Sequence, residues 1–203
     1  MHFISLGGTC ATKYQIDKKL KQPTHFFDWL GNDYFSTVGV FNSTTEELLN
    51  PSNFKILPES IYDPDPHDHI YFGWNYGCVS SHDLKHGETN LSDFISKYSR
   101  RHKRLLEMIK SNEKICFIRY DHWGDSSDVS FLEKSINNPN CLIFVLQELE
   151  DNIPLIRIKN KVVTINISLV RKTSMSKDWR RDDLDWDHIW EIITSTSNKI
   201  LSN

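Results

Sequence analysis

Long apolar runs and a strong charge bias are both missing from this chain. No segment approaches the roughly 20 consecutive apolar residues that span a bilayer, and the first residues carry no basic, apolar secretory leader. The net charge is −3, with basic and acidic residues interspersed, so bulk electrostatics favour neither nucleic acid nor an anionic membrane as a partner. We therefore expect a soluble, cytoplasmic protein without a nucleic-acid or membrane partner.

Cysteine pairs, internal repeats and low-complexity tracts are also lacking. The 4 cysteines form no C-x-x-C pair, and we expect reduced thiols rather than disulfides. Cys116 and Cys141 lie in apolar runs typical of buried strands, which leaves Cys10 and Cys78 for chemistry. With 203 residues the chain can bury the core of one domain, which we expect to span residues 1–203.

Helical and strand patterns alternate through the second half of the chain. Apolar periodicity predicts helices over 91–111, 128–138 and 182–202, and strands over 114–120, 141–148 and 161–170. Residues 31–77 are rich in proline, Asn and Asp, and their pattern indicates loops and short strands. The alternation favours a single α/β domain with a largely parallel sheet flanked by helices.

The most distinctive local pattern is a strand, a glycine turn and a helix at residues 3–21. The run "FISL" is followed by Gly7, Gly8 and Cys10, and then by a helical pattern that ends before Pro23. A cysteine at a helix start lies near unsatisfied N–H groups, which favour a thiolate and could form an oxyanion hole. The alternative is that the glycines only make a tight turn and the thiol packs beneath it.

A nucleophilic thiol needs a base, and "GCVSSHDLKHGE" supplies imidazoles. His82 is followed by Asp83, with His86 four residues further on. In a helix His82 and His86 would share a face, whereas in a loop His82 alone is the natural base. The alternative is a surface His-Asp pair that initiates a turn. A second candidate imidazole, His122, follows Asp121 in "RYDHWGDSSD" at a predicted strand end.

Four segments together resemble a known family. The stretches "ISLGGTCATKYQIDKKL", "THFFDWLG", "SSHDL" and "YSRRHKRLLEMIKSNEKICFIRY" are similar to successive motifs of a bacterial and viral domain family of unknown function, described as papain-like cysteine peptidases. The resemblance covers roughly residues 3 to 170. One departure is Phe26, which stands where the family usually has proline before Phe27, Asp28 and Trp29.

The resemblance implies an enzyme that uses a Cys-His pair for acyl transfer. It assigns Cys10 as nucleophile and His82 as general base, with Asp83 or Asp28 orienting the imidazole. It implies a peptide, acyl or glycan-type substrate, no cofactor and no metal, and a papain-like α+β fold as the alternative architecture. The residues that we expect to bind substrate are Gly7, Gly8, Thr9, Trp29, Arg100, Arg101, Asp121 and His122.

Two other functions remain open at this stage. A strand, glycine turn and helix also suit a Rossmann-like nucleotide-sugar transferase or a phosphate-binding domain, in which Arg100, Arg101 and Arg104 could contact phosphates. The G-x-G-x-x-G fingerprint is incomplete, which weakens this reading. A metal-dependent phosphohydrolase could draw ligands from "DPDPHDH" and the later histidines, although a solvated acidic loop is the simpler interpretation. The oligomeric state is left open.

Overall fold

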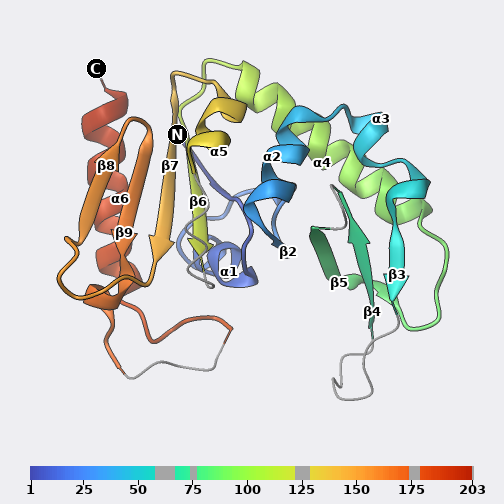
Figure 1. Ribbon diagram of the computed structural model, residues 1–203, viewed down its shortest axis with the longest axis horizontal. Coiled ribbons are helices and arrows are strands. Elements are labelled where there is room, and N and C mark those ends of the chain that lie inside the picture. The colour runs from blue at the N-terminus through green and yellow to red at the C-terminus, as the bar shows by residue number, and fades with distance from the viewer. Residues whose placement is uncertain (58–66, 74–76, 122–128, 174–178, 203) are drawn as a thin grey trace.

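The fold is built on two β-sheets that lie side by side (Figure 1). The computed structural model describes residues 1–57, 67–73, 77–121, 129–173 and 179–202. Sheet A has five strands in the order β1-β6-β7-β9-β8, and sheet B has four in the order β2-β5-β4-β3.

Sheet A is parallel except at one edge. Its strands are β1 (His2–Ser5), β6 (Ile115–Asp121), β7 (Cys141–Gln147), β9 (Val162–Asn166) and β8 (Ile156–Lys159). The pairs β1-β6, β6-β7 and β7-β9 are parallel, and β8 joins β9 antiparallel. The predicted α/β fold with a largely parallel sheet flanked by helices is confirmed. The edge strand β8 was not predicted, because all four of its residues are exposed and carry no burial pattern.

Helices cover both faces of sheet A. The helices of the described chain are α1 (Cys10–Lys19), α2 (Tyr34–Asn42), α3 (Thr45–Leu48), α4 (Ser92–Lys110), α5 (Ser130–Ile136) and α6 (Trp186–Leu201), of which α3 lies on the side of sheet B (Figure 1). The long helices α4 and α6 lie where apolar periodicity placed them. Alternation along β6 divides its side chains: Cys116 and Ile118 pack with α1 and α6, whereas Ile115 and Phe117 face α2, α4, α5 and sheet B.

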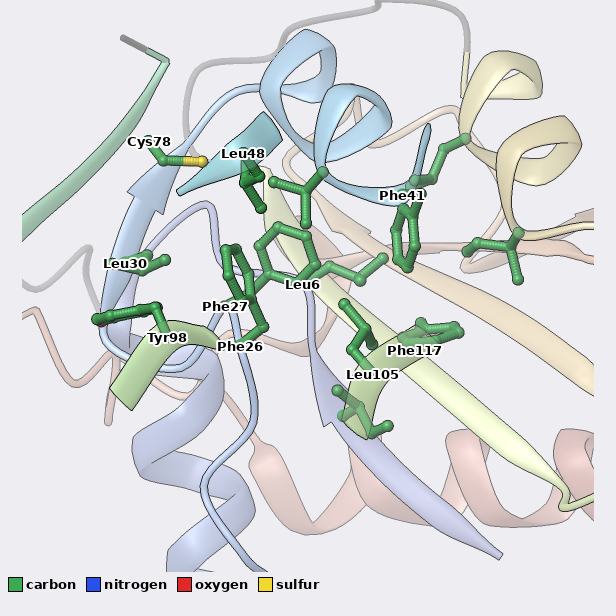
Figure 2. Packing of buried hydrophobic residues seen from close by; sticks show 14 of the residues in the cluster. Leu6, Phe26, Phe27, Leu30, Phe41, Leu48, Cys78, Tyr98, Leu105 and Phe117 are labelled. Carbon is green, nitrogen blue, oxygen red and sulfur yellow. The ribbon is translucent and has the colours of Figure 1, made fainter. Parts of the chain in front are cut away.

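The hydrophobic core on the Ile115 and Phe117 side of β6 joins the two sheets. Phe26 is fully buried, and its ring lies 5.1 Å from that of Phe27 and 5.5 Å from that of Tyr98 on α4. Figure 2 shows part of this cluster, with Leu6 and Phe117 from the sheet A side. The aromatic ring at position 26 therefore contributes core packing where the family usually has proline.

Sheet B and its neighbours correct one expectation from the sequence. Its strands are β2 (Leu30–Asn32), β3 (Lys55–Leu57), β4 (His67–Phe72) and β5 (Cys78–Lys85), all paired antiparallel. The prediction of loops and short strands over 31–77 was wrong for the helices α2 and α3, whereas β3 and β4 are short strands. The prediction of a helix start or a loop near His82 was wrong as well, because this segment is strand β5. Histidines and serines at strand positions hid the alternation.

No helix in the described part of the chain is long and apolar enough to cross a membrane.

Candidate active site

The turn between β1 and α1 depends on two glycines with left-handed backbone conformations. Gly7 has φ 73° and Gly8 has φ 80°, a region that other residues rarely adopt. A Cβ on Gly7 would lie 1.8 Å from Asn32 Oδ1, and a Cβ on Gly8 would lie 2.3 Å from the Tyr120 carbonyl oxygen. Glycine therefore lets the chain pass close to β2 and β6 before α1 begins.

A buried polar network ties this turn to both sheets. Asn32 Oδ1 accepts the Gly8 N–H at 2.7 Å, and Asn32 Nδ2 donates to the Leu6 carbonyl at 3.0 Å. Arg119 on β6 donates to the same Leu6 carbonyl at 3.2 Å and to the Asn32 carbonyl at 2.8 Å. Its guanidinium lies 4.2 Å from the centre of the Tyr34 ring, and Arg119 is only 3% exposed. The backbone ahead of Cys10 is thus fixed by side chains from β2 and β6.

The amide groups of the turn divide into bonded and available ones. The Gly7 N–H donates to Ser5 Oγ at 3.1 Å, and the Ala11 N–H donates to Thr9 Oγ1, the N-cap of α1, at 3.3 Å. The Thr9 N–H has no acceptor among the residues that the structure describes. The Cys10 N–H likewise donates to no other residue in the described part of the chain. The N–H groups of Thr9 and Cys10 are therefore the donors that remain beside the thiol.

Cys10 differs from the other three cysteines in its access to solvent. It is half-buried at the first position of α1, whereas Cys78, Cys116 and Cys141 are buried. Burial raises the pKa of Cys78 to about 12, of Cys116 to about 11 and of Cys141 to about 12. Burial also raises the pKa of Cys10, and the hydrogen bond from its own amide only partly opposes this. The expectation that the helix start acidifies this thiol was wrong: desolvation outweighs it.

A bulge in β5 separates His82 from Asp83. Asp68 pairs with Leu84 and Ile70 with Ser80, so residues 81–83 of β5 lie opposite a single residue of β4. This irregularity turns His82 outward, where it is exposed and its ring centre lies 6.4 Å from that of His67. The structure records no contact between His82 and Cys10 within the ranges that it covers.

The Asp83 carboxylate points the other way, toward α4. It accepts hydrogen bonds from Ser80 Oγ, from Tyr98 Oη at 2.9 Å and from Lys97 Nζ. Burial raises the pKa of Asp83, but the bonds from Lys97, Ser80 and Tyr98 outweigh it and leave the pKa below its ordinary value. Since His82 and Asp83 point to opposite sides, Asp83 as seen here links sheet B to α4.

Asp28 lies beneath α1 and binds a lysine. Its Oδ2 accepts from Lys13 Nζ at 3.0 Å and from the His25 N–H at 2.7 Å. Asp28 is 1% exposed, and burial raises its pKa while the charge of Lys13 opposes the rise. The carboxylate thus anchors the "FFDWL" segment to the helix that carries Cys10.

The other predicted substrate-binding residues are spread over several elements. Arg100 donates to Ser96 Oγ at 2.8 Å, and the Arg101 guanidinium lies 5.1 Å from the Tyr98 ring centre, so both contact α4 itself. Asp121, at the end of β6, is 4% exposed and accepts from Gln147 Nε2 at 3.3 Å. His122 lies outside the described residues.

Trp29 marks a feature that the sequence did not reveal. It has φ 66°, a left-handed conformation that is unusual for a bulky residue, and its ring centre lies 6.4 Å from that of Trp179. Trp179 in turn lies 5.4 Å from Tyr14 on α1. Sequence analysis missed Asn32, Arg119, Tyr14 and Trp179 as site residues. Only the arginine ending the "FIR" motif carried a signal, since a charged residue in a buried strand needs a reason.

Metal-binding residues do not gather in the described part of the chain: no group of three or more His, Cys, Asp or Glu side chains there could hold an ion. His67 and His69 share one face of β4, as strand alternation predicts, and both are half-buried. His86 Nδ1 instead contacts Asp68 Oδ1 at 2.7 Å.

Comparison with models of known protein families gives one match. The model of the family described as "Putative papain-like cysteine peptidase (DUF1796)" matches residues 1–174, and the chain therefore belongs to this family. No match comes from curated proteins or from solved structures.

Proposed function

From this family membership we propose that the chain is a thiol hydrolase, a cysteine peptidase in the broad sense, with Cys10 as the nucleophile. The observation that supports it best is the position of the sulfur. Cys10 is the accessible cysteine, it begins α1, and the available N–H groups of Thr9 and Cys10 adjoin it. Such a thiol can attack a carbonyl whose oxygen enters the same turn.

The proposed reaction begins with a neutral thiol, because burial raises the pKa of Cys10. An imidazole takes the proton as sulfur bonds to the substrate carbonyl carbon, and the carbonyl electron pair becomes an oxyanion that accepts from Thr9 and Cys10 N–H. Collapse breaks the bond to the leaving amine or alcohol, which receives the proton. Water then hydrolyses the thioester with help from the same base.

His82 is our proposed base, and His122 is the alternative. The criterion that separates them is hydrogen-bond reach to Cys10 in the complex with substrate, which a general base needs. His82 is exposed on β5, so its imidazole is accessible to a bound substrate. We assign Asp28 a positioning role, because it binds Lys13 one turn after Cys10.

The same turn is the basis of the second candidate, a site for phosphate or a nucleotide sugar. A parallel sheet with a helix start after β1 favours it. However, the amides of Gly7, Gly8 and Ala11 already donate within the protein. Two remaining donors suit one carbonyl oxygen better than a phosphate group, and so we prefer acyl transfer.

The test is the burst of p-nitrophenol released from p-nitrophenyl acetate at neutral pH. We expect one equivalent per protein, an acetyl group on Cys10 by peptide mass spectrometry, and loss of both in Cys10→Ala. The control Cys78→Ala removes a fully buried thiol and should keep the burst. His82→Ala and His122→Ala identify the base, because loss of the imidazole that takes the proton slows the acylation of Cys10.

A different set of results would reject the hydrolase proposal. An absent burst in folded wild-type protein, together with a higher melting temperature in phosphate or in a uridine diphosphate sugar, rejects the hydrolase and supports the phosphate site.

A further inference from the structure

Cys10 and Tyr14 lie on the same side of α1. They are four residues apart, which places their side chains one turn apart with Cβ atoms roughly 6 Å from each other. Both are half-buried rather than covered. A group bonded to the Cys10 sulfur can therefore extend over the Tyr14 ring.

Trp179 lies between Tyr14 and Trp29 and contacts both rings. The ring of Trp179 meets Tyr14 edge to face at 5.4 Å and 72°, and meets Trp29 at 6.4 Å and 69°. The Arg180 guanidinium lies 4.7 Å from the Trp179 ring and 5.8 Å from the Tyr14 ring. Trp179 nevertheless remains 47% exposed. Tyr14, Trp29 and Trp179 form what we call the aromatic platform.

The platform stands on rigid elements. Gln15 Nε2 on α1 donates to the Arg180 carbonyl at 2.9 Å and to Asp182 Oδ1 at 3.0 Å. The next residue, Arg181, is 5% exposed, and its carbonyl accepts from Trp186 Nε1 at 2.8 Å. The segment that carries Trp179 is therefore attached to α1 and α6, and its position does not rely on the ring contacts alone.

Trp29 is held in an unfavourable backbone conformation. A φ of 66° suits glycine or asparagine, whereas a bulky side chain is rare there. Trp29 is only half-buried, so core packing does not account for a tryptophan at this position. Strain that persists without a packing reason is often found where a side chain serves binding.

Resting on the proposed function, we propose that the aromatic platform is a substrate subsite that binds an aromatic side chain of a peptide substrate acylating Cys10. Ring faces and edges that are partly exposed offer stacking to a flat apolar group. A sugar would need neighbouring polar groups, but Gln15 and Asp182 already bind each other, and Asp182 also binds Lys18 at 3.3 Å. The subsite therefore favours flat aromatic groups, which can stack on the partly exposed rings beside the Arg180 guanidinium.

Two electrophiles of equal reactivity test this proposal: N-benzyl iodoacetamide and N-methyl iodoacetamide. At pH above the Cys10 pKa, we expect the benzyl compound to alkylate Cys10 roughly three- to tenfold faster relative to free cysteine. Trp179→Ala should abolish this preference, measured as the ratio of the benzyl rate to the methyl rate in the same variant. Phe131→Ala is the control, since Phe131 is 59% exposed on α5 and outside the platform.

The outcomes separate the two proposals. Equal benzyl and methyl rates in wild type, or a preference that survives Trp179→Ala, overturn the subsite while the acetyl burst still decides the hydrolase. If Cys10 reacts with neither compound, saturation-transfer NMR of Cys10→Ala protein with N-acetylphenylalaninamide and N-acetylalaninamide decides the subsite. Signal for the first compound only, lost in Trp179→Ala, supports it, and equal or absent signals reject it.

Discussion

Two polar networks, a buried one under the Gly7-Gly8 turn and a partly buried one between β5 and α4, fix different parts of the fold. Under the turn, Arg119 and Asn32 bond to backbone carbonyls and to the Gly8 amide. Between β5 and α4, the partners of Asp83 within the described ranges are the side chains of Ser80, Lys97 and Tyr98. The first network fixes the backbone ahead of Cys10, and the second fixes a helix against a sheet.

The difference shows how to tell a positioning network from a structural one. Removing a side chain under the turn changes where amides point, and so it should affect both chemistry and stability. Removing Asp83 should affect stability alone. The variants below separate these effects, from the largest expected change to the smallest.

Gly8→Ala should be the most damaging change. Its Cβ would lie 2.3 Å from a strand carbonyl, and φ 80° adds backbone strain. We expect a loss of about 3 kcal/mol in the free energy of unfolding, measured in urea. Gly87→Ala is the matched control, because Gly87 has φ 77° and no atom within 4 Å of its Cβ, and it should lose only about 1 kcal/mol. Equal losses of unfolding free energy in the two variants would show that the close approach of the turn to β6 does not add to the cost of the Gly8 substitution.

Asp83→Ala should cost about 2 to 3 kcal/mol of unfolding free energy, because it leaves Lys97 and Tyr98 without their acceptor. The acetyl burst per folded molecule should be unchanged. A burst that disappears in a variant of wild-type stability would instead mean that Asp83 orients the base.

Asn32→Ala should reduce unfolding free energy by about 1 to 2 kcal/mol and slow the burst on the order of tenfold, since the Gly8 amide loses its acceptor. Thr37→Val removes a neighbouring hydroxyl that Asn32 Nδ2 contacts at 2.5 Å but keeps the Gly8 bond. It should lose stability without slowing the burst. If both variants slow the burst equally, the cause is a general loss of packing around the turn and not loss of the Gly8 hydrogen bond.

Trp29→Gly should relieve about 1 kcal/mol of backbone strain. This relief should offset the lost ring contact with Trp179, so the free energy of unfolding should not fall. The benzyl preference of Cys10 should fall at the same time. A clear loss of stability would show that the tryptophan is retained for packing.

The pH dependence of Asp83 should give the smallest effect. Its pKa is lowered on folding from 3.8, so its stabilisation is fully present above that value and is lost as pH falls through the lower, folded-state pKa. The stability difference between wild type and Asp83→Asn should be constant near neutrality and narrow only below pH 3.8. Narrowing at higher pH would contradict the ion pair with Lys97.

Periodicity predicted the parts of the fold that are periodic. Helices α4 and α6 and strands β6 and β7 have continuous apolar patterns, and they lie where the pattern placed them. Sheet B escaped prediction because β2 and β3 have three residues each, and because a bulge interrupts β5. Short strands depend on partners that are distant in sequence.

The site could be predicted in its first element and not in its surroundings. Two glycines and a cysteine before a helix indicated the turn at Cys10 directly. The direction of Asp83 depends on a register shift, and the contact of Gly8 with Asn32 joins residues 24 apart. Neither feature can be recognised in the local sequence, because both depend on how segments distant in sequence pack against each other.

The Leu6 and Asn32 carbonyls share one guanidinium that comes from far along the chain. During synthesis the thiol emerges early, but the partner that shapes its backbone arrives only with β6. A nascent or cleaved chain that lacks β6 therefore carries Cys10 without its assembled turn. Assembly of the turn is in this way coupled to completion of the sheet, so a half-made chain would lack the backbone geometry that the proposed reaction needs.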